Sequence, residues 1–92
     1  MRTYRLRFID AWGNEDEGYE FNDFTGSDTI RTRSKLASMS DEALLRWFIK
    51  NNWLKGKVKD FYVDDLAHGD GFCLNVCRAD GKPLFELTSE EQ

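Results

Sequence analysis

The chain has 92 residues, 40% of them hydrophobic and 14% aromatic, and a formal net charge of −4 at pH 7. That length predicts one domain over residues 1–92, and the composition is that of a folded chain rather than a disordered one. The negative charge argues against bulk attraction to nucleic acid or to an anionic membrane. No apolar run approaches the ~20 residues of a membrane span, and arginines interrupt the N-terminal segment. We therefore expect a cytoplasmic protein with no membrane partner.

The first third of the chain predicts two β-strands. Over Arg2–Ile9, apolar residues alternate with polar ones, as in a strand with one buried face. The acidic segment Trp12–Gly18 is expected to connect this strand to a second one, in which Tyr19 and Phe21 alternate with polar neighbours. The next segment, Thr25–Leu36, has cations at every second position in its second half and is compatible with a strand or a loop.

A single helix is expected after Ser40. This serine is a suitable N-cap, and Asp41 and Glu42 follow it at the end of the helix where negative charge is favourable. The helix is expected to end near Asn51–Asn52. Apolar residues recur at three- and four-residue spacing, which predicts one buried helix face formed by Leu44, Leu45, Trp47, Phe48 and Ile49.

The last third predicts three strands, at Val58–Leu66, Phe72–Arg78 and Leu84–Thr88. Asp80-Gly81 is typical of a two-residue hairpin turn, because both residue types tolerate a positive φ. A turn there places Val76 opposite Phe85 and Leu74 opposite Leu87, so that apolar side chains pair on one face. The whole chain thus reads ββ-α-βββ, an α+β fold in which a single α-helix packs on an antiparallel β-sheet. The order of the strands in that sheet is left open.

Two groups of residues suggest metal or redox chemistry at first sight. Cys73 and Cys77 lie on one predicted strand, where four residues separate them by about 13 Å, too far for a disulfide or a shared zinc ion. The segment His68–Gly71 has aspartates nearby in the sequence but no second histidine, and its glycines are typical of a turn. No nucleotide-binding or hydrolase motif occurs. We expect no catalytic residue, no metal and no cofactor.

Acidic residues cluster along the chain more than the net charge suggests. The stretch from Asp10 to Asp28 contains no lysine or arginine. Carboxylates carried on strands and a loop present a negative surface to a basic groove of a partner protein. The predicted partner-binding residues are Glu15, Asp16, Glu17, Glu20, Asp23, Asp64 and Asp65. The alternative is that these carboxylates only solvate the surface.

Three functions are compatible with these patterns. We expect a small non-enzymatic protein-binding module, an acidic inhibitor that occupies the basic, nucleic-acid-binding surface of a partner protein. A short acidic α+β chain without catalytic motifs is similar in type to the small inhibitor and immunity proteins of phages and mobile elements. The alternative is a weak single-stranded nucleic-acid-binding domain, with Trp53 stacking on bases and the Lys55–Lys59 segment on phosphates. A small metal-dependent enzyme is the third hypothesis.

Overall fold

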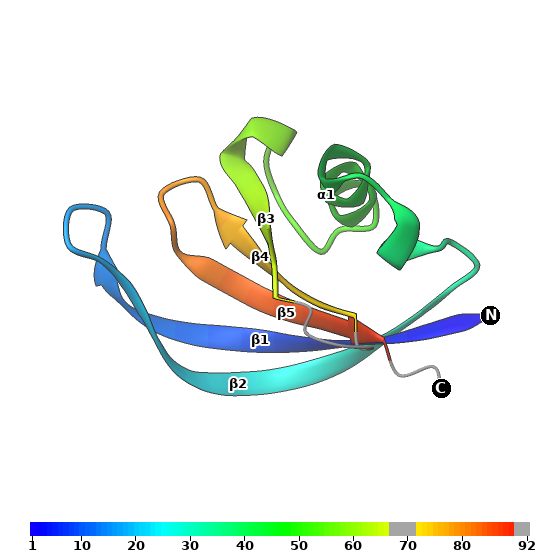
Figure 1. The fold of residues 1–92 in the computed structure, drawn as a ribbon, viewed down its shortest axis with the longest axis horizontal. Coiled ribbons are helices and arrows are strands. Elements are labelled where there is room, and N and C mark those ends of the chain that lie inside the picture. The colour runs from blue at the N-terminus through cyan, green and yellow to red at the C-terminus, as the bar shows by residue number, and fades with distance from the viewer. Residues whose placement is uncertain (67–71, 90–92) are drawn as a thin grey trace.

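The computed structural model of the chain describes residues 1–66 and 72–89, which form one antiparallel sheet and one α-helix (Figure 1). This confirms the predicted α+β class and the element order ββ-α-βββ. The elements are β1 (Arg2–Asn14), β2 (Gly18–Thr32), α1 (Asp41–Lys50), β3 (Phe61–Asp65), β4 (Cys73–Arg78) and β5 (Pro83–Ser89), with two short 3₁₀ helices, η1 (Leu36–Ser38) and η2 (Val58–Asp60).

The strand order in the sheet is β2-β1-β5-β4-β3, and every neighbouring pair is antiparallel. The last strand of the chain, β5, therefore lies at the centre of the sheet, between β1 and β4. The helix α1 lies over one face of the sheet, and no described helix covers the opposite face (Figure 1). In residues 1–66 and 72–89, no helix combines the length and the apolar character that crossing a membrane requires.

The hydrophobic core lies between α1 and the sheet face beneath it. Leu87 of β5 pairs with Leu6 on one side and with Leu74 on the other, and all three side chains are buried. The helix contributes Phe48, which packs edge-on against Phe85 with 5.0 Å between the ring centroids. Burial of apolar side chains is the main source of stability in such a domain. The core is completed by Tyr4, Ile30, Leu36, Leu44, Leu45, Leu54 and Val76.

The helix begins and ends close to the predicted positions. The Ser40 hydroxyl accepts a hydrogen bond from the Ala43 N–H at 3.2 Å, as an N-cap does. At the other end, Asn52 is left-handed with φ 66°, and the Trp53 N–H bonds back to the Phe48 carbonyl at 2.9 Å. This motif turns the chain back toward the sheet. Within the predicted apolar face, the fully buried residues are Leu44, Leu45 and Phe48, and the half-buried ones are Trp47 and Ile49.

The first two strands are longer than predicted. Pairing continues to Asn14 opposite Gly18, so Trp12–Gly18 is not a loop, and only residues 15–17 turn the chain. Most of Thr25–Leu36 belongs to β2, which ends at Thr32. The sequence pattern was misleading here because two register shifts between the strands interrupt the alternation of apolar and polar residues. β1 and β2 nevertheless stay paired on both sides of these shifts, from Arg2 opposite Thr32 to Asn14 opposite Gly18.

The strand predicted from Val58 begins only at Phe61. Residues Val58–Asp60 form η2 instead, and the Asp60 carboxylate accepts a hydrogen bond from the Lys57 N–H at 2.8 Å. A side-chain hydrogen bond of this local kind holds the backbone in a turn, in competition with strand pairing.

The register predicted for the β4–β5 hairpin is confirmed. Val76 pairs with Phe85 and Leu74 with Leu87, so the apolar side chains share the core face. Just beyond Val76, a register shift leaves one extra residue in β5 before the strands reach the turn.

The turn itself differs from the predicted two-residue form. The Arg78 N–H donates to the Lys82 carbonyl at 2.8 Å, so three residues lie between the paired positions. Gly81 has φ 103°, whereas Asp80 does not have a positive φ. A two-residue turn of the predicted type needs positive φ at both central residues. The Asp80 carboxylate accepts hydrogen bonds from the Arg78 side chain and the Lys82 N–H, which stabilises the three-residue form.

We predict that Gly81→Val lowers the free energy of unfolding by about 1–3 kcal/mol, because a β-branched residue is strained at positive φ. Urea denaturation of the two proteins measures the difference. Ala79→Val is the matched control, since Ala79 lies in the same turn and does not have a positive φ. Equal stability of the wild type and Gly81→Val would contradict the assigned turn.

Candidate functional site

The distal half of the β1–β2 hairpin projects beyond the rest of the sheet. β1 pairs with β5 only from Tyr4 to Phe8, so from Ile9 onward its pairing partner is β2 alone. We call residues 9–24 the arm. The arm curls away from the body of the sheet at the end opposite the N-terminus (Figure 1). It lengthens the molecule to 41 Å along the longest axis, against 26 and 23 Å along the others.

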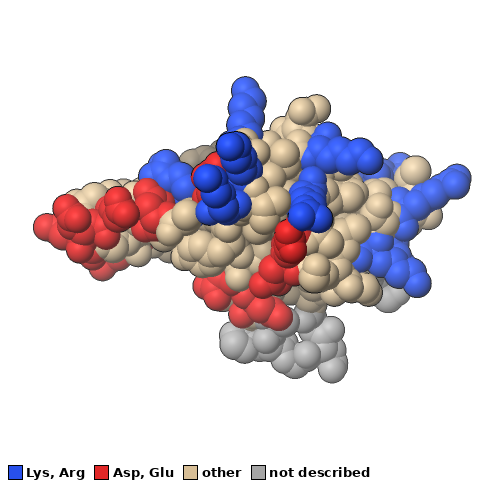
Figure 2. Space-filling view, turned by 90° about the horizontal axis from the view of Figure 1, so that it is seen from above, with Lys and Arg blue, Asp and Glu red and all other residues tan. Residues whose placement is uncertain are grey.

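Most of the predicted partner-binding residues lie on the arm. Figure 2 shows carboxylates covering this end of the molecule, whereas the body carries lysines and arginines together with further carboxylates, and the opposite end carries cations. Negative charge that is concentrated on a projecting element directs the electrostatic field of the molecule and attracts cationic partners to that element. The predicted residues that the structure brings together here, all exposed, are Glu15, Asp16, Glu17, Glu20 and Asp23.

Asp64 and Asp65 are exposed as well, but they do not join the arm. Both lie on β3, at the edge of the sheet farthest from β2. Asp64 pairs with Asn75 of β4, Asn75 pairs with Glu86 of β5, and Glu86 pairs with Arg7 of β1. Three steps between neighbouring strands separate Asp64 from β1, which is about 14 Å across the sheet. The tip of the arm lies several residues farther along β1. The seven predicted residues therefore do not form one continuous acidic surface, because the structure separates Asp64 and Asp65 from the five on the arm.

The turn at the tip of the arm is tightly built. The Glu17 N–H donates to the Asn14 side-chain oxygen at 2.8 Å, which closes the turn. Gly13 and Gly18 have φ 115° and 87°, and a Cβ on Gly13 would collide with the Gly18 carbonyl oxygen. Glycine is required at position 13 because the two backbones approach so closely there. The carboxylates of residues 15–17 are consequently displayed together at the end of the arm.

A shallow hollow of about 230 Å³ lies beside this turn. Trp12 and Glu20 face each other across the two strands, and Trp12 is 63% exposed. Large aromatic residues that remain exposed are typical of protein interfaces, where one tryptophan can supply much of the contact energy. Trp12 was not among the expected site residues, although its position next to a glycine at the edge of an acidic run is a signal that could have found it. The hollow is lined by Trp12, Gly13, Glu17, Gly18 and Glu20.

The tryptophan that was expected to be accessible is a different one. Trp53 is half-buried and packs against the core, because the backbone turn after α1 directs it there. It is therefore not the free stacking platform that the nucleic-acid hypothesis requires. The lysines of that segment, Lys55, Lys57 and Lys59, are exposed.

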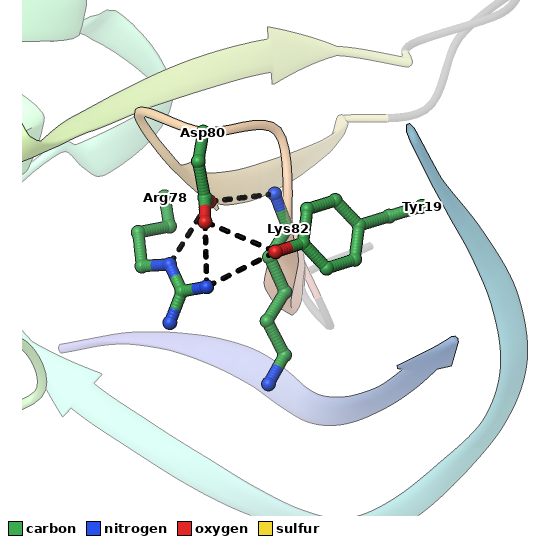
Figure 3. Close-up of polar contacts among 4 residues, drawn as sticks. All are labelled: Tyr19, Arg78, Asp80 and Lys82. Atoms are coloured by element: carbon green, nitrogen blue, oxygen red, sulfur yellow. Dashed lines mark hydrogen bonds and ion pairs between the residues drawn. The ribbon is translucent and has the colours of Figure 1, made fainter. Parts of the chain in front are cut away.

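A polar cluster joins the arm to the β4–β5 turn (Figure 3). The Tyr19 hydroxyl donates to Asp80 Oδ2 at 3.0 Å and accepts from Arg78 Nη2 at 3.2 Å. Arg78 also contacts Asp80 directly, through Nε at 2.9 Å and Nη2 at 2.6 Å, a bidentate geometry that fixes both side chains. We call Tyr19, Arg78 and Asp80 the clasp. Because Tyr19 is next to residues that line the hollow, the clasp holds the hollow in place relative to the sheet.

The clasp changes the ionisation of its members. Hydrogen bonds from Arg78 hold the pKa of the Asp80 carboxyl well below its ordinary value of 3.8. The same contact with Asp80, followed by the hydrogen bond to Tyr19, raises the pKa of the Arg78 guanidinium. Both groups therefore remain charged over the physiological pH range.

A second set of contacts supports the arm on the sheet face that the helix does not cover. Phe21 packs edge-on against Phe24, with 5.0 Å between the ring centroids. The guanidinium of Arg7 lies over the Phe24 ring, 3.8 Å from its centroid, and donates to Glu86 at 2.6 Å. The arm is thus tied both to β1 and, through Arg7, to β5.

The remaining candidate chemistry receives no support from the part of the chain that is described. Both cysteines of β4 are free thiols. Burial raises the pKa of Cys73 and of Cys77, which disfavours a reactive thiolate at neutral pH. Within residues 1–66 and 72–89, no group of three or more His, Cys, Asp or Glu side chains could hold a metal ion. The segment His68–Gly71, considered above as a metal site or a turn, lies outside the described residues.

The arm thus combines an exposed indole and a concentration of carboxylates with two sets of contacts that hold it in place. No protein-family model, curated protein or solved structure matches this chain. Chemically, the arm is suited to attract and bind a cationic group, because carboxylates are negatively charged acceptors and the face of an indole attracts cations.

We predict that the clasp stabilises the fold at neutral pH and ceases to do so in acid. The pKa of Asp80 is lower in the folded state than in the unfolded chain, so its contribution is complete above the ordinary value of 3.8 and is lost as the pH falls below that value. The difference in unfolding free energy between the wild type and Asp80→Asn should therefore shrink from about pH 7 to about pH 2.5. Urea denaturation at the two pH values measures it.

The control is Asp28→Asn, because Asp28 is exposed on β2 and takes no part in the clasp. Its effect on the free energy of unfolding should be small at both pH values. A difference for Asp80→Asn that stays constant between the two pH values would show that the Asp80 carboxylate is not stabilised by the clasp.

Proposed function

We propose that this chain is a small, non-enzymatic protein-binding module that binds a basic surface of a partner protein through the arm. The observation that carries the proposal is the display of Glu15, Asp16 and Glu17 at the tip of a projecting hairpin, next to the exposed Trp12. Attraction between opposite charges accelerates the encounter with a cationic partner. An exposed tryptophan loses its contact with water when the partner binds and then supplies an apolar contact, which charged side chains at the rim of an interface do not provide.

The partner surface we propose is one that otherwise binds nucleic acid, so that the chain acts as an inhibitor of the small phage or mobile-element type. Surfaces that bind a phosphate backbone are lined with lysine and arginine. The arm offers such a surface a series of negative charges along an extended hairpin. With its two strands only about 5 Å apart, the arm is a narrow ribbon that suits a groove. Asp64 and Asp65 take no part in this proposed contact.

Two competing explanations account for fewer of the observations. A surface that serves only solubility needs charge but no defined geometry, whereas the tip turn and the clasp both fix the arm in one position. Binding of single-stranded nucleic acid would have to rely on exposed lysines without the Trp53 platform, and the arm would repel phosphates.

We predict that reversing two charges at the tip, by Glu15→Lys together with Glu17→Lys, slows association with the partner and leaves the fold intact, since both side chains are exposed. Charges of this kind act mainly on the encounter rate, so the loss should be larger at low salt than at high salt. The matched control is Asp28→Lys together with Asp64→Lys. It makes the same change in net charge at two exposed positions away from the arm.

Wild type, arm variant and control variant serve as parallel baits for capture from a cell lysate. Association rates with the captured proteins are then measured at two salt concentrations. The expected result is a basic protein that binds the wild type and the control well and the arm variant slowly. Identical capture and identical rates for all three baits would retire the proposal.

A further inference from the structure

We propose that the hollow beside Trp12 binds an arginine side chain of the partner. This inference rests on the proposed function and names the chemical group that the arm recognises. The hollow is lined by Trp12, which carries an exposed indole, and by Glu17 and Glu20, which carry carboxylates. None of the residues that line it is a lysine or an arginine. The lining residues therefore offer a cation an aromatic ring and two carboxylates, and none of them carries a positive charge of its own.

The size of the hollow suits a single side chain. Its volume of about 230 Å³ is below the range of roughly 300–1,000 Å³ that is typical of pockets for drug-sized ligands. A side chain that projects from a partner protein needs to place only its end group in such a space. Volume and charge thus favour the same occupant, one cationic side chain.

Arginine fits this arrangement better than lysine. A guanidinium is planar, so it can stack flat on the exposed indole while the N–H groups in its plane point outward to carboxylates. The hollow is lined by two carboxylate-bearing residues besides Trp12, Glu17 and Glu20, and carboxylates are the acceptors that such a fork of donors matches. The lysine ammonium is compact and strongly hydrated, so it gains less from the face of a ring.

The chain itself already contains such an arrangement. The guanidinium of Arg7 lies 3.8 Å from the centroid of the Phe24 ring and donates to Glu86 at 2.6 and 3.0 Å. In the hollow, Trp12 corresponds to Phe24 as the ring, and Glu20, its cross-strand partner, corresponds to Glu86 as the acceptor. Indole is a stronger partner for cations than phenyl. What the hollow lacks is the counterpart of Arg7, which we infer that the partner supplies.

The backbone that carries the lining residues of the hollow is held in position before any ligand arrives. Trp12 and Glu20 are paired across the strands, and the close approach at Gly13 keeps those strands together. Tyr19, the neighbour of Glu20, is fixed by a hydrogen bond to Asp80 and by one from Arg78. A site whose groups are already ordered loses less conformational entropy on binding.

The test uses two homopeptides of equal length, one of arginine and one of lysine, titrated calorimetrically into the protein at one ionic strength. The wild type should bind the arginine peptide more tightly than the lysine peptide. Trp12→Leu should weaken binding of the arginine peptide about two- to thirtyfold and remove most of the preference. Phe8→Leu is the matched control, because Phe8 is 37% exposed on the same hairpin but does not line the hollow.

The carboxylates are tested in the same way. Glu20→Gln should weaken binding of the arginine peptide more than Glu15→Gln, although the two variants lose the same charge from the same arm, because only Glu20 lines the hollow. A second measurement uses the wild type alone, by nuclear magnetic resonance. The indole N–H signal of Trp12 should shift on addition of the arginine peptide, and those of Trp47 and Trp53 should not.

The possible outcomes separate the two proposals. If Trp12→Leu binds the arginine peptide as the wild type does, or if the Trp12 signal does not shift, the arginine site is overturned. If Glu15→Lys with Glu17→Lys still weakens binding of both peptides in that case, the arm binds basic surfaces by charge alone, and the proposed function stands. If that double variant also binds both peptides as the wild type does, the proposed function is contradicted together with the arginine site.

Discussion

The central position of β5 is the constraint on which the rest of the structure depends. Its residue Leu87 lies between Leu6 and Leu74, so one short strand brings the N-terminal hairpin and the C-terminal strands under the same helix. β5 has 7 residues whereas β1 has 13. It therefore supports only the proximal half of β1. The arm exists because the longer strand continues, paired with β2, past the point where the central strand ends.

A hairpin of two strands is only marginally stable in water, so the arm needs other support. The contacts that provide it are of one kind, an arginine bound to a carboxylate and touching an aromatic side chain of the arm. At the β4–β5 turn, the Tyr19 hydroxyl donates a hydrogen bond to Asp80 and accepts one from Arg78. On the uncovered face, Arg7 bridges from the ring of Phe24 to β5. Such partly exposed pairs contribute little free energy individually, and their main effect is to fix geometry.

This construction separates charge within a small molecule. The net charge of −4 understates the local field, because the arm carries carboxylates and no lysine or arginine, while the cations lie over the rest of the molecule together with the other carboxylates. Two arginines, Arg7 and Arg78, hold the arm, and neither lines the hollow near its tip. The tip can thus attract a basic partner at a distance, and the exposed Trp12 can make contact once the partner has arrived. The proposed function and the proposed arginine site both follow from this separation.

The sequence by itself determined what depends on neighbours along the chain: the capped helix after Ser40, the pairing of Val76 with Phe85, the α+β class and the identity of the acidic stretch. Helix caps, periodicity and turn residues act over a few positions, and a pattern can show them. The tertiary structure alone decided the strand order, the length of the arm, the separation of Asp64 from the arm, and which tryptophan is exposed. It also decided the clasp, in which Tyr19 meets Asp80 across 61 positions of sequence. The physical reason is that periodicity reports which face of its own element a residue occupies, whereas these features depend on which distant segment packs beside it.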